Sequence, residues 1–282
     1  MSLFLQQWMG ELIKLFARRR TYIGFGAFIL LETALLIMFR IRGGEKWFEK
    51  IISGQGRAFE HYYSALTLAL IVLAFSVLIL GALYIALVSG DIVAKENEDG
   101  HYRLLLSRPV SRLRLLFLKY LTCLCYTVVL IQFISWSAFL LGVLVRGWGG
   151  GFFAMAPEVG LMTFYEWGPG MERFALGSLF LSFSMMTVSS VAFFLSCLPI
   201  KPAAATIGAL SYILIDMILR NMELMESYKH LLLTAHMGNW TRILADPIPW
   251  AVIIRSYTVL TAMCASLFIV GTAIFEARDL KS

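Results

Sequence analysis

Charged residues are scarce in this sequence: Asp, Glu, Lys and Arg make up 15% of its 282 residues, while hydrophobic residues make up 59%. A soluble globular protein has roughly 25% charged and about 45–50% apolar residues. One soluble core of this size cannot bury so much apolar surface, so a lipid bilayer is the expected solvent. The composition therefore argues against a soluble enzyme and against a disordered chain.

Cysteine is also scarce, and the cysteines fall within or at the ends of apolar runs: Cys123, Cys125, Cys197 and Cys264. A free cysteine in such a run behaves as a small hydrophobe. Cys123 and Cys125 are two positions apart on an expected helix, so they point to different faces and suit neither a disulfide nor a metal. We expect inert packing and exclude a secreted disulfide scaffold.

The sequence contains no GxxxxGK[ST] phosphate loop, no HExxH motif and no CxxC motif. Its four histidines lie in three expected loops, without a carboxylate at metal-ligand spacing. We therefore expect no catalytic residue, no metal and no cofactor on this chain. The net charge of +6 lies beside apolar runs, where it orients helices and attracts lipid headgroups. Membrane lipids, and no nucleic acid, are the expected partners.

Apolar runs long enough to cross a bilayer as helices, about 20 residues each, occur six times. The predicted spans are Tyr22–Phe39, Ala65–Val88, Tyr120–Leu144, Phe174–Ile200, Ala203–Leu219 and Ala251–Phe275. An even number of spans puts both termini on one side. Lys14, the arginines at 18–20 and the basic loop after the second span predict that this side is the cytoplasm.

Residues 1–20 contain Leu5, Trp8, Met9, Leu12 and Phe16 at helical spacing. This pattern predicts an amphipathic helix lying in the membrane interface before the first span. Two outer loops, 145–173 and 220–250, are long; the first is rich in glycine and aromatic residues, and the second is expected to hold short helices. No second domain is expected.

The loop between spans two and three is the most informative segment, and residues 96–112 read ENEDGHYRLLLSRPVSR. An acidic cluster ends at Gly100, which favours a helix end or turn, and an apolar triplet follows. Pro109 disfavours helical backbone at Arg108, so the chain should bend there. These features predict a short cytoplasmic helix suited to docking in a groove of a soluble partner. A solvated basic loop is the alternative.

This segment resembles the signature of ABC transporter type-2 permeases, in which an acidic cluster and Gly-Thr precede Leu-Leu-Ser-x-Pro-hydrophobic-Ser-Arg and a Lys of the next span. The matching residues are Glu96, Glu98, Asp99, Gly100, Leu105, Leu106, Ser107, Pro109, Val110, Ser111, Arg112 and Lys119. The chain departs from the signature at His101 and Tyr102, where Thr usually follows Gly. Glu11-Leu12-x-Lys14 and the closing Phe275–Leu280 stretch are also similar.

The resemblance implies a single permease domain over residues 1–282, forming half of an ABC exporter in the plasma (inner) membrane of a prokaryote. Two permeases, identical or paired with a homologous chain, would sit on two separate ATPase subunits that bind ATP and Mg. Residues 1–20 would form the connecting helix, and loop 89–112 would contain the coupling helix. The expected ATPase-docking residues are Glu96, Glu98, Asp99, Gly100, Arg103, Leu105, Arg108 and Pro109.

Polar residues within the spans suggest a translocation path, because ionisable groups in a bilayer usually face a cavity or a partner. The candidates are Glu32, Gln132, Ser182, Ser189 and Asp216. Ser178, Ser182, Ser189 and Ser196 share one helix face. The alternative for the acids is protonation or a hydrogen bond to a neighbouring group, and for the serines close helix packing.

The sequence thus predicts an all-α membrane protein with six transmembrane helices, an interfacial N-terminal helix and a cytoplasmic coupling helix. Its expected function is that of a non-catalytic permease. The alternatives are an integral-membrane enzyme acting on a lipid, using Glu32, Asp216, His230 or His236, and a membrane scaffold subunit. Neither the substrate nor the choice between a homodimer and a heterodimer can be read from the residues.

Overall fold

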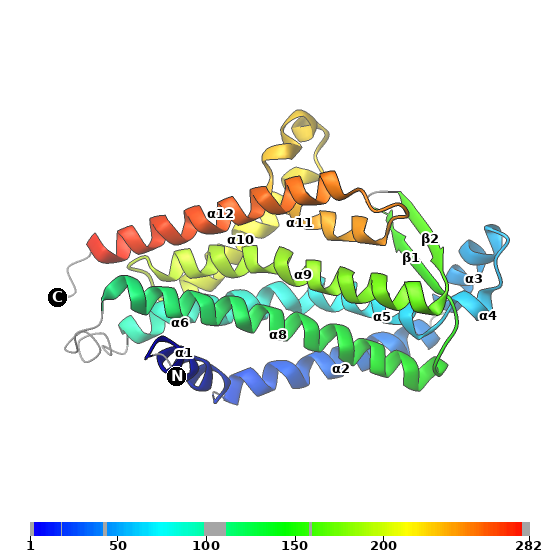
Figure 1. The fold of residues 1–282 in the computed structure, drawn as a ribbon, viewed down its shortest axis with the longest axis horizontal. Coiled ribbons are helices and arrows are strands. Elements are labelled where there is room, and N and C mark those ends of the chain that lie inside the picture. The colour runs from blue at the N-terminus through cyan, green and yellow to red at the C-terminus, as the bar shows by residue number, and fades with distance from the viewer. Residues whose placement is uncertain (1–2, 18, 42–43, 99–110, 158–159, 278–282) are drawn as a thin grey trace.

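The computed structural model describes residues 3–17, 19–41, 44–98, 111–157 and 160–277. It is a bundle of long helices with a small hairpin at one end (Figure 1). Six helices are long and apolar enough to cross a membrane, as the sequence predicts. They are α2 (Arg19–Ile41), α5–η1–α6 (Ala65–Ser76, Val77–Gly81 and Ala82–Glu98), α8 (Arg112–Arg146), α9 (Trp167–Ser196), α10 (Pro202–Arg220) and α12 (Trp250–Ala277).

The bounds of these helices differ from the predicted spans. The second continues to Glu98 instead of ending at Val88, the third begins at Arg112 instead of Tyr120, and the fourth begins at Trp167 instead of Phe174. Hydropathy marks where apolar residues stop, whereas backbone hydrogen bonds carry a helix on through polar residues. Within the predicted loop 89–112, residues 89–98 and Arg112 are therefore helix.

Local signals fix two of the helix starts. Ser111 has extended backbone, and its Oγ accepts a hydrogen bond from the Arg114 amide at 3.3 Å, so it caps α8. Pro202 occupies the first turn of α10, where its missing N–H costs no helix hydrogen bond. At the other end of α8, Gly147 has a φ of 80°, a value that favours glycine, and terminates the helix.

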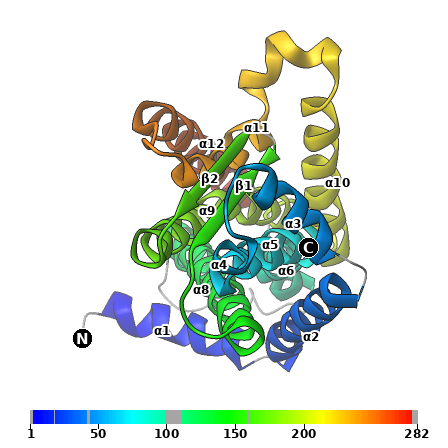
Figure 2. The same ribbon diagram turned by 90° about the vertical axis from the view of Figure 1, so that its right-hand side faces the viewer.

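The helix α9 lies at the centre of the bundle. In its most apolar stretch 61% of residues are buried, against 17% in α10 and 22% in α12. It packs on α6, α8, α10 and α12, and the view along the bundle shows α2, α10 and α12 around the outside (Figure 2). Its serines at positions 178, 182, 189 and 196 are all buried, and small side chains of this kind allow membrane helices to approach closely.

The helix α1 (Leu3–Phe16) lies crosswise to the spans (Figure 2). Its location in a membrane interface stays a prediction. Leu5 and Met9 are exposed, as an interfacial face requires, and so is Ile13, whereas Leu15 is buried against the bundle. The ends of α6 and α12 and the start of α8 lie at this same end of the molecule (Figure 1).

The opposite end holds α3 (Gly44–Gly54), α4 (Phe59–Tyr62) and an antiparallel hairpin of β1 (Phe152–Ala156) and β2 (Leu161–Tyr165). The hairpin lies in residues 145–173, which the sequence predicts to be a loop, so that prediction was wrong here. Two short strands are marginal alone; here Phe152 and Phe153 are buried, and the Phe153 amide donates to Thr67 Oγ1 of α5 at 2.9 Å. The register pairs Phe153 with Phe164, whose rings stack 4.9 Å apart.

The segment between α10 and α12 contains short helices, as the sequence predicts. They are η3 (Glu223–Leu231), α11 (Leu233–Met237) and η4 (Gly238–Leu244). η4 packs on α9, and α11 on α10 and α12. Leu233, Met237, Ile243 and Leu244 are buried by these contacts, so α11 and η4 are part of the core, whereas η3 has no buried residue.

Candidate functional site

A cluster of charged side chains lies where α1, α6 and α8 meet. The ammonium group of Lys119 on α8 is 2.9 Å from a carboxylate oxygen of Glu11 on α1 and 2.7 Å from one of Glu96 on α6. Lys14 lies one turn beyond Glu11 and binds its other oxygen at 2.7 Å. We call Glu11, Lys14, Glu96 and Lys119 the charged cluster.

The charged cluster is largely removed from water. The side chain of Lys119 is 0% exposed, and those of Glu11 and Glu96 are 11% and 10% exposed. A buried ammonium group is tolerated only when anionic partners surround it, which the two carboxylates do here. The second oxygen of Glu96 is buried without a hydrogen-bond partner among the described residues.

The electrostatics of the cluster are visible in Glu11. Burial alone would raise the pKa of its carboxyl, but the positive charge of Lys119 and the hydrogen bonds from Lys14 and Lys119 outweigh burial. The net effect lowers the pKa of Glu11 below its ordinary value of 4.5. Glu11 is therefore ionised at neutral pH and holds α1 against the bundle.

The charged cluster connects α1 to both helices that border residues 99–110. Glu96 lies in the last turn of α6, and Lys119 lies in the first turns of α8. Arg112, the first residue of α8, also donates a hydrogen bond to the carbonyl of Glu276 in α12 at 3.3 Å. The helix ends on both sides of residues 99–110 are thus bound to α1, and the start of α8 is also bound to α12.

Of the predicted docking residues, the structure describes Glu96 and Glu98. Glu98, the last residue of α6, is exposed, whereas Glu96 is 8% exposed and turned towards Lys119. The inward pairing of Glu96 gives it a contact within the chain, and its docking role stays a prediction. The remaining members lie outside the described residues: Asp99, Gly100, Arg103, Leu105, Arg108 and Pro109.

The polar candidates within the spans lie at separate helix contacts. Glu32 of α2 is 0% exposed and accepts a hydrogen bond from Ser137 Oγ of α8 at 2.9 Å. Gln132 of α8 donates to Ser182 of α9 at 3.0 Å. Ser189 of α9 and Ser89 of α6 are hydrogen-bonded at 2.7 Å. Each of these polar groups is thus hydrogen-bonded to a side chain of a neighbouring helix.

Asp216 of α10 contacts the start of α11. Its two carboxylate oxygens accept hydrogen bonds from the amides of Leu233 at 3.2 Å and Thr234 at 2.7 Å, at the start of α11. Two backbone donors at a helix start are stabilised by such a carboxylate. Asp216 thus holds the start of α11 against α10. The transport roles of Asp216, Glu32, Gln132, Ser182 and Ser189 stay predictions.

Sequence reasoning missed the pairing of Glu11 with Lys119. Both residues belong to the pattern that resembles the family, but nothing in the sequence indicates that two residues 108 positions apart meet. A lysine at the start of an apolar span and a glutamate in an amphipathic helix were the available signals. In the part of the chain that the structure describes, no three His, Cys, Asp or Glu side chains lie close enough to hold a metal ion.

Sequence comparison with known proteins gives a family match and one curated relative. Residues 9–216 match the profile of the ABC-2 family transporter proteins, a range that begins within α1 and ends within α10. A curated protein of Bacillus subtilis (strain 168), the uncharacterized protein YhcI, is 32% identical over 123 residues. That alignment spans 42% of this chain and 38% of the length of the relative. Six apolar spans and a family match over most of its length show that this chain is a multi-pass membrane protein of the ABC-2 transporter family.

Proposed function

We propose that this chain is the permease subunit of an ATP-driven ABC exporter in the inner membrane of a prokaryote. Two permease copies, or one copy and a homologous chain, form the translocation path and bind two separate ATPase subunits. ATP and Mg bind to the ATPases, and this chain contributes no catalytic residue. The end of the bundle that holds the charged cluster faces the cytoplasm in this arrangement.

The observation that carries the proposal is the charged cluster. Glu11, Glu96 and Lys119 join α1 and the two helices that border residues 99–110 into one unit. An ATPase that binds the segment between α6 and α8 would therefore move α1, α6 and α8 together. Coupling requires that the ATPase bind two states of the permease with different free energy, and a rigid unit transmits such a difference.

The N-terminal helix has a defined part in this mechanism. The apolar residues Leu5, Met9 and Ile13 are exposed on it, while Glu11 is held inward by Lys119. This division suits a helix that slides along the headgroup region while it follows the coupling segment. The helices α6 and α8 then carry the motion to α9, against which both pack.

The test is co-purification of an ATPase from mild detergent. The wild-type chain is expected to bring with it a protein that contains a phosphate loop and hydrolyses ATP. Leu105→Asp, which places a charge in the apolar part of the coupling segment, is expected to lose it. Leu224→Asp is the matched control, because Leu224 is 86% exposed in η3, whereas the charged cluster lies on α1, α6 and α8.

The outcomes separate clearly. Loss of the ATPase in Leu105→Asp with retention in Leu224→Asp supports docking through the segment between α6 and α8. Retention of the ATPase in both variants would place the docking elsewhere. Absence of any ATPase from a folded wild-type preparation, made from cells that express the neighbouring genes, would overturn the proposal.

A further inference from the structure

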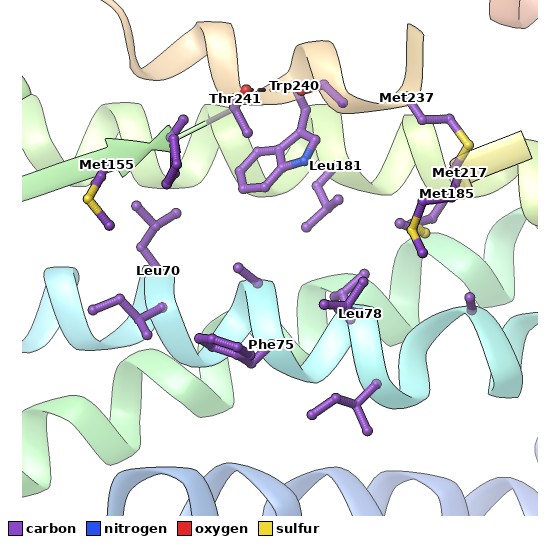
Figure 3. A pocket seen from close by; sticks show the side chains of 18 of the residues that line it. Leu70, Phe75, Leu78, Met155, Leu181, Met185, Met217, Met237, Trp240 and Thr241 are labelled. Atoms are coloured by element: carbon purple, nitrogen blue, oxygen red, sulfur yellow. Dashed lines mark hydrogen bonds between the residues drawn. The ribbon is translucent and has the colours of Figure 1, made fainter. Parts of the chain in front are cut away.

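A shallow groove of about 570 Å³ runs along the exposed side of α12, next to α9. Its lining consists of Phe180 of α9 and one face of α12: Trp250, Ile253, Ile254, Tyr257, Thr258, Thr261, Ala262 and Ala265. A cavity of about 810 Å³ lies beside η1, and Figure 3 shows Leu78 and Trp240 on opposite sides of it. The groove shares no lining residue with that cavity, so it is a separate feature of the molecule.

The aromatic floor of the groove is held in place by contacts within the chain. The ring of Phe180 meets the ring of Tyr257 edge-on, with centroids 5.0 Å apart, and lies 6.3 Å from the ring of Trp250. The hydroxyl of Tyr257 donates a hydrogen bond to the carbonyl of Phe180 at 2.7 Å and lies 2.8 Å from the Ser184 hydroxyl. Because these side chains are already fixed, a ligand that binds on them orders little of the protein.

The α12 side of the groove consists of short side chains. Those exposed along it are Thr258, Thr261, Ala262 and Ala265. The hydroxyls of Thr258 and Thr261 donate hydrogen bonds to carbonyls of their own helix, to Ile254 at 2.8 Å and to Tyr257 at 2.7 Å. The threonines therefore present their methyl groups to the groove. An apolar chain fits such a surface better than a polar solute does.

The groove lies in the half of α12 that is nearer the hairpin end of the bundle (Figure 1). α12 has 28 residues, so it is about 42 Å long at 1.5 Å per residue, whereas the hydrocarbon core is about 30 Å thick. Both ends of α12 can thus reach the head groups. Trp250, in its first turn, is 47% exposed, as is typical of tryptophan at the membrane interface.

Arg255 supplies a positive charge beside the groove. It is exposed, and within the described ranges it makes no hydrogen bond or ion pair. The nearest carboxylates in the chain are Asp246, which pairs with Arg173 at 3.6 Å, and Glu276, at the other end of α12. At 100° per residue, Arg255 lies within about 20° of Ala262 on the helix surface, so it is on the rim of the groove. The long side chain of an arginine at this depth extends towards the head groups.

We propose that the groove binds an anionic phospholipid of the leaflet at the hairpin end. One acyl chain lies along the groove against Phe180 and Ala265, and Arg255 binds the phosphate. A guanidinium can bind a phosphate through two parallel hydrogen bonds. A lipid with net negative charge is favoured, because a zwitterionic lipid carries an ammonium group of its own that opposes the arginine. This inference goes beyond the proposed function and does not depend on an ATPase, since it needs only that α12 spans the membrane.

The test is photolabelling of the full chain in phosphatidylcholine nanodiscs. Two labelling lipids are compared at the same low content, phosphatidylglycerol and phosphatidylcholine, each with a diazirine in one acyl chain. Labelling of the peptides that contain Phe180 and Ala262 should favour phosphatidylglycerol about fivefold, the effect of one basic residue on an anionic lipid. Unlabelled phosphatidylglycerol should reduce it. Leu30 of α2, which is 74% exposed, gives the unsaturable background of general lipid contact.

Two sets of variants separate the charge from the groove. Arg255→Gln should lower the preference for phosphatidylglycerol to that of the background, and Arg255→Lys should keep most of it. Arg40→Gln, at an exposed arginine of α2 at the hairpin end, is the matched control and should label as wild type does. Ala262→Trp places an indole in the groove and should reduce labelling of Phe180 by both lipids severalfold. Ala273→Trp, at an exposed position of α12 outside the groove, should not.

The outcomes decide the inference either way. Saturable labelling that prefers phosphatidylglycerol, and that loses its preference in Arg255→Gln and its intensity in Ala262→Trp, supports it. Equal labelling of the groove by the two lipids in wild type, or an unchanged preference in Arg255→Gln, overturns it. Absence of groove labelling while Leu30 is labelled would show that another chain or a second copy covers the groove, which also overturns it. Because no ATPase is present, failure here leaves the proposed function untouched, and failed ATPase co-purification leaves this inference untouched.

Discussion

The substitution Lys119→Met tests whether the charged cluster holds α1 to the bundle. Methionine is apolar and of similar length, so it fills the buried site but removes the positive charge that Glu11 and Glu96 share. Glu11 keeps Lys14 as a partner, at 2.7 Å. Glu96 loses the ammonium group, and its other oxygen already lacks a partner among the described residues.

The expected cost is large because the charge left behind is buried. Removing one member of a buried ion pair destabilises by about 3–5 kcal/mol. Glu11 and Glu96 have side chains 11% and 10% exposed, so water reaches them slightly and the lower limit applies. A loss of about 3 kcal/mol corresponds to roughly a hundredfold change in the opening equilibrium. A helix of 14 residues such as α1 is marginal by itself, so this contact decides whether it stays docked.

The assay is hydrogen exchange at the amides of α1 and of the last turn of α6, in nanodiscs at neutral pH. Lys119→Met should raise exchange in both elements by roughly a hundredfold and leave α9 unchanged. Lys50→Met, at an exposed lysine of α3, is the control and should have no effect in either element.

A compensating variant makes the reasoning refutable. Glu11→Gln, Lys119→Met and Glu96→Gln together leave no buried charge, and replacing a whole buried ion cluster is often close to neutral. The triple variant should therefore recover most of the protection in α1. Unchanged exchange in Lys119→Met, or equal loss in the single and triple variants, would show that the cluster does not hold α1 by charge pairing.

Three further predictions follow from the contacts described above. The pKa of Glu11 is lowered, so its contribution to holding α1 on the bundle is fully present above pH 4.5 and is lost as the pH falls through the lowered pKa. A spin label on Leu3→Cys should become mobile in that acid range. Glu11→Gln should abolish the transition. Asp216→Ala removes both acceptors at the start of α11, which should cost about 1.5–3 kcal/mol for each charged hydrogen bond. Hydrogen exchange of the Leu233 and Thr234 amides should rise at least tenfold. Unchanged exchange there would contradict the capping role. Gly142→Ala places a methyl group 2.7 Å from the carbonyl oxygen of Ala65, so it should destabilise the protein by about 1–3 kcal/mol in thermal unfolding. Gly26→Ala, where a methyl group meets nothing within 4 Å, should not destabilise it. Equal melting temperatures of the two variants would refute the close contact of α5 and α8.

The spans were predictable because membrane insertion depends on a local property of the chain. A run of about 20 apolar residues predicts a membrane helix whatever its neighbours are, and all six runs are helices in the structure. The helix bounds were less predictable, since α6 and α8 continue into polar residues that hydropathy assigns to a loop. The hairpin was missed because its strands depend on contacts with α5, such as the bond from the Phe153 amide to Thr67.

In the candidate site, too, the local sequence predicted some features and the tertiary contacts decided others. The residues 96–119 indicated a coupling segment and the family resemblance, and the family match over residues 9–216 confirms that resemblance. The sequence placed Glu96 among the docking residues, but the fold turns it towards Lys119. Side-chain direction depends on how α6, α8 and α1 cross, and no local pattern encodes that crossing.

By itself, the sequence determined that this protein is a membrane protein, which six stretches of the chain form the spanning helices, and which loop contains the family signature. Each of these depends on residues that are close together in the chain. The tertiary structure decided which polar groups meet: Glu11 with Lys119, Glu32 with Ser137 and Asp216 with the start of α11. It also decided where a cavity opens beside η1. The physical reason is that buried charges and voids arise from the packing of whole helices, so their energies depend on partners 17 to 108 positions away in the chain as well as on neighbours.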